Sequence, residues 1–102
     1  MAGALRPSAM SQQIKDDDWR LQGQEQYLSG ATLHWRSWTE TRSGWDHDHC
    51  SFCWAKLTDR PDDPALREGY ATDNEYHWVC AKCAADFARR FKFKLVGGPV
   101  AT

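Results

Sequence analysis

Two Cys-x-x-Cys pairs constrain this chain more than any other feature of its sequence. Cys50 and Cys53 form the first pair, Cys80 and Cys83 form the second, and the 102 residues contain no other cysteine. Two cysteines three apart, on a tight turn or a first helical turn, can both point at one ion about 2.3 Å from each sulfur. Because no export signal is visible, metal binding is favoured over disulfides. The pairs therefore predict one structural Zn²⁺ held by four thiolates.

Length and charge exclude several classes of function. A chain of 102 residues buries only a modest core, so a metal that staples the fold is expected. The net charge of −1 gives no general attraction to nucleic acid or to an anionic membrane. No apolar run approaches the length of a membrane span. We therefore expect a cytoplasmic protein of one domain with no membrane partner.

The local patterns place the domain between residues 16 and 97. Residues 1–15 are small and polar without periodicity, which predicts a disordered tail, and residues 98–102 predict a frayed C-terminus. At the start of the domain, we expect a short helix near residues 23–29, ended by Gly30. Alternating apolar and polar residues then predict a strand over residues 31–39.

The second cysteine pair lies between a predicted hairpin and a predicted helix. Residues 70–79 are typical of two strands joined by a turn at Asp73–Asn74, because Asp and Asn tolerate the positive φ of such turns. Apolar residues at helical spacing follow, at Ala84, Phe87, Ala88 and Phe91. Phe93 and Leu95 then alternate with lysines, which predicts a short strand that returns to the sheet.

These elements predict an α+β fold. A cysteine turn, a loop, a hairpin and a helix that carries the second pair follow one another over residues 50–91. This order resembles a treble-clef zinc finger, which consists of a zinc knuckle, a β-hairpin and a C-terminal helix. The rival is a two-knuckle zinc ribbon, in which glycine usually follows each pair. Trp54 and Ala84 stand at those positions here, which favours the treble clef.

A wider resemblance covers roughly residues 17–96. The strings DDWRLQGQEQYL, WDHDHCSFCWAKL and EGYATDNEYHWVCAKCAADF resemble a family of small uncharacterised bacterial proteins. That family has the pattern Asp-Trp-Arg-Leu, then Trp-Asp-His-Asp-His-Cys-x-Phe-Cys-Trp-Ala-Lys, then Tyr-x-Trp-x-Cys-x-x-Cys-x-x-Asp-Phe. The resemblance implies a bacterial origin and supports the domain limits, and it implies no particular activity.

The string Asp46-His47-Asp48-His49 raises the alternative of a nuclease. Some treble-clef proteins are His–metal finger nucleases with a similar string, in which a histidine activates water and an acidic or Asn residue holds a divalent cation. In those nucleases the string lies between the cysteine pairs, whereas here it precedes both. They also carry an Asn soon after the second pair, where this chain has Ala84 and Ala85. We therefore predict no catalytic residues.

Three other side chains are expected to support the metal ligands. His49 adjoins the first pair and His77 lies on the predicted hairpin, so each is placed to orient a ligand through a hydrogen bond. Lys82, inside the second pair, can offset the negative charge of four thiolates. The sequence leaves open whether His47 and His49 face the metal or a partner.

The remaining signals concern partners. Five basic residues against the single acid Asp86 give residues 80–96 a charge of +4: Lys82, Arg89, Arg90, Lys92 and Lys94. They indicate either a solvated face or a surface for an anionic partner, which would be RNA, DNA or an acidic protein surface. Six Trp, three Tyr and four Phe supply either an aromatic core or a binding face. We predict a non-enzymatic, zinc-stabilised protein-interaction module. Neutralising a toxin or effector is one role that such a module can have. A nucleic-acid-binding zinc finger is the alternative, ahead of the nuclease.

Overall fold

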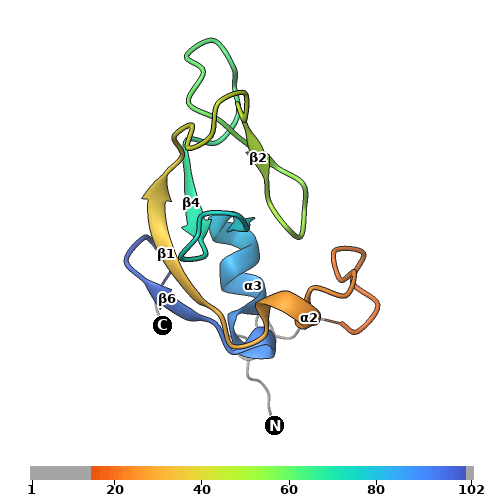
Figure 1. Cartoon of the computed structure of the whole chain (residues 1–102). Coiled ribbons are helices and arrows are strands. Elements are labelled where there is room, and N and C mark those ends of the chain that lie inside the picture. The colour runs from red at the N-terminus through yellow and green to blue at the C-terminus, as the bar shows by residue number, and fades with distance from the viewer. Residues whose placement is uncertain (1–14, 101–102) are drawn as a thin grey trace, which may run out of the picture.

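The computed structural model describes residues 15–100 of the chain. Its elements follow one another as α2 (Glu25–Leu28), β1 (Thr32–Ser37), β2 (Asp48–His49), β3 (Lys56–Leu57), β4 (Glu68–Ala71), β5 (Trp78–Val79), α3 (Ala81–Phe91) and β6 (Lys94–Val96) (Figure 1). The predicted short helix and first strand are both present. The predicted tail lies outside the described residues except for Lys15.

Four strands form one sheet in the order β5-β4-β1-β6, and β2 and β3 form a separate antiparallel ribbon. Strand β1 runs antiparallel to β4 and parallel to β6. In Figure 1, β1 curves along one side of α3, and the chain returns from α3 to pair β6 with β1. The strand predicted after the helix therefore does rejoin the sheet. The knuckle ribbon, the hairpin of β4 and β5, and helix α3 follow in treble-clef order.

Helix α3 begins at the second cysteine pair. Its N-cap is Cys80, whose sulfur accepts a hydrogen bond from the backbone N–H of Cys83 at 3.4 Å. The helix ends where Lys92 adopts a left-handed conformation with φ 57° and its N–H bonds back to the last turn. The predicted apolar stripe is buried except for Ala88, which is half-buried. One residue, Cys80, thus both starts the helix and offers a thiol.

All four phenylalanines of the chain meet in one cluster. The ring of Phe52 stacks on Phe87 with centroids 4.5 Å apart, and it meets Phe91 edge-on at 5.2 Å. Phe93 in turn stacks on Phe91 at 5.5 Å. Phe52 lies between the two cysteines of the first pair, while the other three lie on or just after α3. This cluster therefore packs the cysteine knuckle directly onto the helix.

The turn of the hairpin is longer than the sequence predicts. Strand β5 begins at Trp78 rather than at Glu75, and the N–H of Thr72 bonds to the carbonyl of His77 at 3.1 Å. The residue with positive φ is Glu75, at 57°, and not Asp73 or Asn74. Asn74 has a different role, because its side-chain oxygen accepts from the hydroxyl of Thr72 and the N–H of Tyr76. The hydrogen bonds of its side chain, rather than a tolerance of positive φ, explain the Asn at this position.

Residues 98–100, which we expected to fray, contact the sheet. The hydroxyl of Tyr70 donates to the carbonyl of Gly97 at 2.8 Å and accepts from the N–H of Val100 at 3.1 Å. A Cβ added at Gly98 would lie 2.5 Å from that hydroxyl and 2.8 Å from the ring of Trp35. The buried tyrosine thus holds the chain beyond residue 97, so the ordered part extends further than the sequence predicted.

We expect Gly98→Ala to destabilise the fold more than Gly30→Ala. Both glycines have a similar positive φ, +75° and +72°, so each substitution carries a strain of about 1 kcal/mol. Only at Gly98 would the new methyl group meet other atoms within 4 Å, which adds about 1–3 kcal/mol. Urea unfolding of the metal-loaded protein measures the difference. Equal losses for the two variants would show that the C-terminal contact is absent in solution.

Candidate metal centre

Four cysteine sulfurs converge at the junction of the knuckle and α3. Cys50 and Cys53 lie on the turn between β2 and β3, and Cys80 and Cys83 lie at the start of α3. The four sulfurs lie within 4.8 Å of one another, and those of Cys53 and Cys80 are 3.7 Å apart. A disulfide requires about 2.05 Å. Sulfurs at the corners of a tetrahedron with 2.3 Å bonds are about 3.8 Å apart, so the arrangement fits a thiolate-bound metal ion.

Backbone hydrogen bonds shape the knuckle. The N–H of Cys50 donates to the carbonyl of Ala55 at 2.8 Å, and the N–H of Trp54 donates to the carbonyl of Cys50 at 3.1 Å. To close this turn Trp54 adopts φ 70°, the conformation in which glycine is usually found. The absence of glycine after the first pair therefore did not distinguish the two folds. Ala84 does distinguish the treble clef from the zinc ribbon, because it lies inside a helix rather than in a second knuckle.

The thiols of Cys50, Cys80 and Cys83 shift one another's pKa. Hydrogen bonds from the thiols of Cys80 and Cys83 lower the pKa of Cys50 to about 2. The same contact with Cys50 raises the pKa of Cys80 to about 12, and it raises the pKa of Cys83 as well. Ionising a second of these thiols is therefore disfavoured, and a bound cation would offset the added charge. Metal uptake should therefore release protons.

Arg20 is the side chain that contacts the cluster from outside it. Its Nη1 donates to the sulfur of Cys83 at 3.5 Å and to Oδ2 of Asp86 at 2.8 Å. Its Nε and Nη2 donate to Asp18, and the guanidinium lies 4.6 Å from the ring centroid of Phe87. Hydrogen bonding to Asp18 raises the pKa of Arg20, so its charge is permanent. A buried cation therefore faces the thiolate cluster.

Sequence reasoning missed Arg20. The available signal was an arginine between two apolar residues, Trp19 and Leu21, with an aspartate two positions earlier. That arrangement suits a local Asp18–Arg20 pair, which the structure contains at 2.9 Å. Nothing in the local pattern indicates that the same guanidinium also reaches residues more than 60 positions away on α3.

Gln24 fastens the N-terminal segment to the knuckle. This buried side chain donates from Nε2 to the carbonyls of Arg20 and Ser51, at 2.8 and 2.9 Å. Its Oε1 accepts from the N–H of Gln22 at 2.7 Å. The segment before β1 is therefore attached to both cysteine pairs, to the first through Gln24 and to the second through Arg20.

The three side chains expected to support the ligands have other contacts. The ring of His77 stacks on Tyr27 with centroids 4.4 Å apart, and the ring of His49 lies 6.1 Å from that of Trp54. Lys82 pairs with Asp86 at 3.3 Å, and so shares its partner with Arg20. Within residues 15–100, hydrogen bonds from side chains outside the cluster reach a cysteine sulfur only from Arg20.

The Asp-His-Asp-His string lies beside the cluster without joining it. His47 and His49 share one side, with ring centroids 4.9 Å apart, as strand alternation predicts. The carboxylate of Asp46 bonds to Nδ1 of His47 at 2.7 Å, whereas Asp48 accepts from two indole groups. In the part of the chain that the structure describes, the cysteines are the one group of His, Cys, Asp or Glu side chains whose ligand atoms converge.

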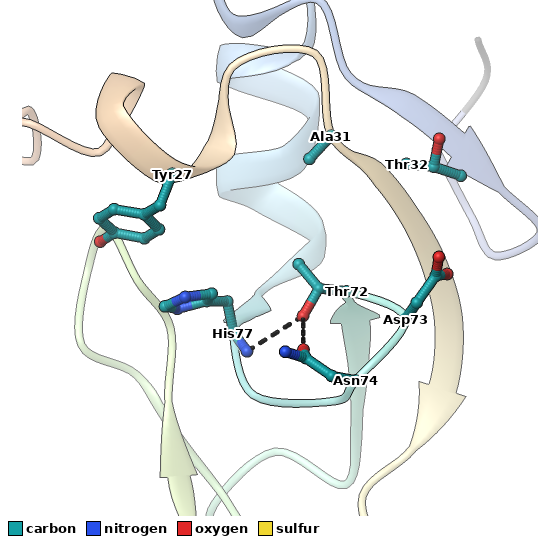
Figure 2. Close-up of a pocket in the computed structure, with 7 residues that line it drawn as sticks. All are labelled: Tyr27, Ala31, Thr32, Thr72, Asp73, Asn74 and His77. Atoms are coloured by element: carbon teal, nitrogen blue, oxygen red, sulfur yellow. Dashed lines mark hydrogen bonds between the residues drawn. The ribbon is translucent and has the colours of Figure 1, made fainter.

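Two surface hollows share the stacked rings of Tyr27 and His77 in their lining. The first, of about 520 Å³, is polar and is shown in Figure 2, where the hydroxyl of Thr72 meets the N–H of His77 and the amide of Asn74. On its rim, Asp73 pairs with His34 of β1 at 2.9 Å. The hydrogen-bonding groups of this hollow are therefore largely occupied by one another.

The second hollow, of about 370 Å³, is here called the aromatic groove. It is lined by Gln22, Gln24, Tyr27, Trp45, Asp48, His49, Cys50, Ser51, Trp54, Tyr76 and His77. Four of these rings are large and exposed, with exposed fractions of 41–59%: Tyr27, Trp45, Trp54 and Tyr76. The excess of aromatic residues thus divides between a buried core and a surface beside the knuckle.

None of the described helices is long and apolar enough to cross a membrane. Searches of protein-family models, of curated proteins and of solved structures return no match for this chain. The function of the site is therefore inferred from the residues of this chain alone.

We expect Arg20→Lys to weaken metal binding by about tenfold to a hundredfold, because lysine keeps the charge but loses the planar fork that reaches Asp18, Asp86 and Cys83 together. Titration against a chromophoric chelator measures the metal affinity. Arg90→Lys is the matched control, since Arg90 on α3 also pairs with an aspartate, the exposed Asp16, but makes no hydrogen bond to a cysteine sulfur. Equal affinities for wild type and Arg20→Lys would contradict this role for Arg20.

Proposed function

We propose that this chain is a zinc-stabilised protein-interaction module without catalytic activity. The observation that carries the proposal is the aromatic groove, which lies directly beside the thiolate cluster and includes Cys50 in its lining. The metal holds the knuckle and α3 together, and the groove is built on that rigid junction. Metal and groove would therefore act as one unit, the first for stability and the second for recognition.

The donor set supports zinc as the metal. Four thiolates in a tetrahedral arrangement are typical of structural Zn²⁺, and iron is the other ion that such a site accepts. Four protein ligands fill a tetrahedral shell, so the site lacks the open coordination position that catalytic zinc sites keep. The ion's place in this proposal is structural.

The exposed rings support a protein partner. Large aromatic side chains dominate the binding energy of protein interfaces, and here four of them surround one concave surface. A small rigid domain with such a groove suits a protein that caps a functional surface of another. We therefore propose, as the finer function, that the chain neutralises a toxin or effector protein in a bacterial cytoplasm.

The basic segment offers weaker support for nucleic-acid binding. Of its five basic residues, Lys82 pairs with Asp86 and Arg90 pairs with Asp16. None of the five lines the aromatic groove, so the exposed rings that can stack on bases lie apart from this basic segment. A protein partner therefore accounts for the aromatic surface better than single-stranded RNA or DNA does.

The protein as purified from bacterial cells should contain one zinc ion per chain, as measured by elemental mass spectrometry. Removing the ion with a strong chelator should unfold residues 45–96, because sites of this kind contribute on the order of 10 kcal/mol of apparent binding free energy. Far-UV circular dichroism and tryptophan fluorescence report the loss, and added Zn²⁺ should restore both. Unchanged signals after verified metal removal would show that the metal is not structural, and a visible absorbance would indicate iron.

Substituting a tryptophan of the aromatic groove should lower the affinity for a partner that binds there. A partner captured from nuclease-treated bacterial lysate, and identified by mass spectrometry, is purified and titrated against Trp54→Ala and Trp19→Ala. Both tryptophans are exposed, at 59% and 65%, but only Trp54 lines the groove. We expect about tenfold or more loss of affinity for Trp54→Ala and little change for Trp19→Ala.

Two outcomes would contradict the proposal. Equal affinity of the two variants for every captured partner would place binding elsewhere on the molecule. Capture that disappears after nuclease treatment, together with salt-dependent affinity that falls in Lys92→Ala and Lys94→Ala, would favour the nucleic-acid alternative. Divalent-metal-dependent cleavage of DNA that is lost in a folded His47→Ala or His49→Ala variant would instead favour the nuclease.

A further inference from the structure

A cation already lies over two of the rings that line the aromatic groove. The guanidinium of Arg42 lies 5.6 Å from the ring centroid of Trp45 and 5.5 Å from that of Tyr76. Both distances are within the range of cation–π attraction. A turn closed by the N–H of Trp45 and the carbonyl of Arg42, at 2.9 Å, sets this arrangement. The two rings therefore form a pair of faces suited to a guanidinium.

Arg42 is held there by the rings alone. Its side chain is exposed, and within residues 15–100 its guanidinium has no hydrogen bond or ion pair. An arginine that stacks without a charged partner can move away without breaking a polar contact. Another guanidinium can therefore take its place between Trp45 and Tyr76.

A carboxylate lies in the same groove. Asp48 is the one acidic side chain among the described residues that line it. Its Oδ2 accepts from the indole nitrogens of Trp38 at 2.9 Å and of Trp45 at 3.1 Å, which fixes the orientation of the Trp45 ring. No partner for its Oδ1 is found among the described residues. The groove therefore combines fixed aromatic faces with an anionic acceptor that has a free oxygen.

We propose that the aromatic groove binds an arginine side chain of a partner protein, stacked on Trp45 and Tyr76 in the place of Arg42 and attracted by the nearby negative charge of Asp48. This inference rests on the proposed function and specifies the chemistry of its partner. Arginine fits better than lysine, because the guanidinium is planar, weakly hydrated and able to stack while donating hydrogen bonds to a carboxylate. Arg42 acts as an internal competitor that covers the rings until the partner arrives.

The test uses capped Gly-Ser-Arg-Ser-Gly and two matched peptides, in which lysine or neutral citrulline replaces arginine. Binding to the zinc-loaded full chain is followed by NMR through the indole N–H signals of the tryptophans. The arginine peptide should shift the signal of Trp45, the citrulline peptide should not, and Trp19, outside the groove, serves as the internal control.

Variants of the groove give the sharper result. Arg42→Ala should bind the arginine peptide about threefold to fivefold more tightly, because the competing cation is gone. Asp48→Asn keeps an oxygen for the two indole groups but removes the charge, and should bind about twofold to fivefold more weakly. Arg60→Ala, which removes an arginine that pairs with Glu40 outside the groove, should bind as wild type does.

The inference is wrong if Arg42→Ala binds the arginine peptide no more tightly than wild type, or if the citrulline peptide binds equally well. The first criterion does not depend on the stability of Asp48→Asn. If the inference fails while binding of a captured partner still requires Trp54, the proposed interaction module is retained. Its partner then binds the groove without an arginine on Trp45 and Tyr76. If no partner requires Trp54, the proposed function itself fails.

Discussion

The convergence of four thiols at one point is the constraint on which the rest of the structure depends. The four sulfurs lie within 4.8 Å of one another, so a metal ion bound there would join two segments that are distant in sequence. The same junction carries Phe52 into the phenylalanine cluster of α3. Metal coordination and core packing therefore act on the same segments, and each fixes the geometry that the other needs.

The N-terminal segment depends on that junction as well. Arg20 binds Cys83 and Asp86 on α3, and Gln24 binds the carbonyl of Ser51 on the knuckle. This segment also supplies Tyr27 to the aromatic groove. The groove is thus assembled from three separate stretches of chain, all of which are positioned around the thiolate cluster. This dependence explains why a concave aromatic surface can form on a domain with so small a core.

How much of the fold could be predicted differed from element to element. Helix α3 and strand β6 followed from their periodicity, because a long apolar stripe and a clear alternation leave few alternatives. The turn of the hairpin was predicted less well, since its conformation depends on hydrogen bonds between Thr72, Asn74 and Tyr76. The contact of Val100 with Tyr70 was not predictable at all, because nothing in a short Gly-Pro segment indicates what it packs against.

The sequence by itself determined the metal ligands, since two matched Cys-x-x-Cys pairs with no other cysteine admit one tetrahedral arrangement. It also determined the order of knuckle, hairpin and helix. Only the tertiary structure decided the surroundings of the site: that Arg20 faces the thiols, that His49 and His77 contact rings instead, and which aromatic side chains are exposed. The physical reason is that ligand spacing is a local property of the chain, whereas burial and side-chain contacts depend on segments that meet only when the chain folds.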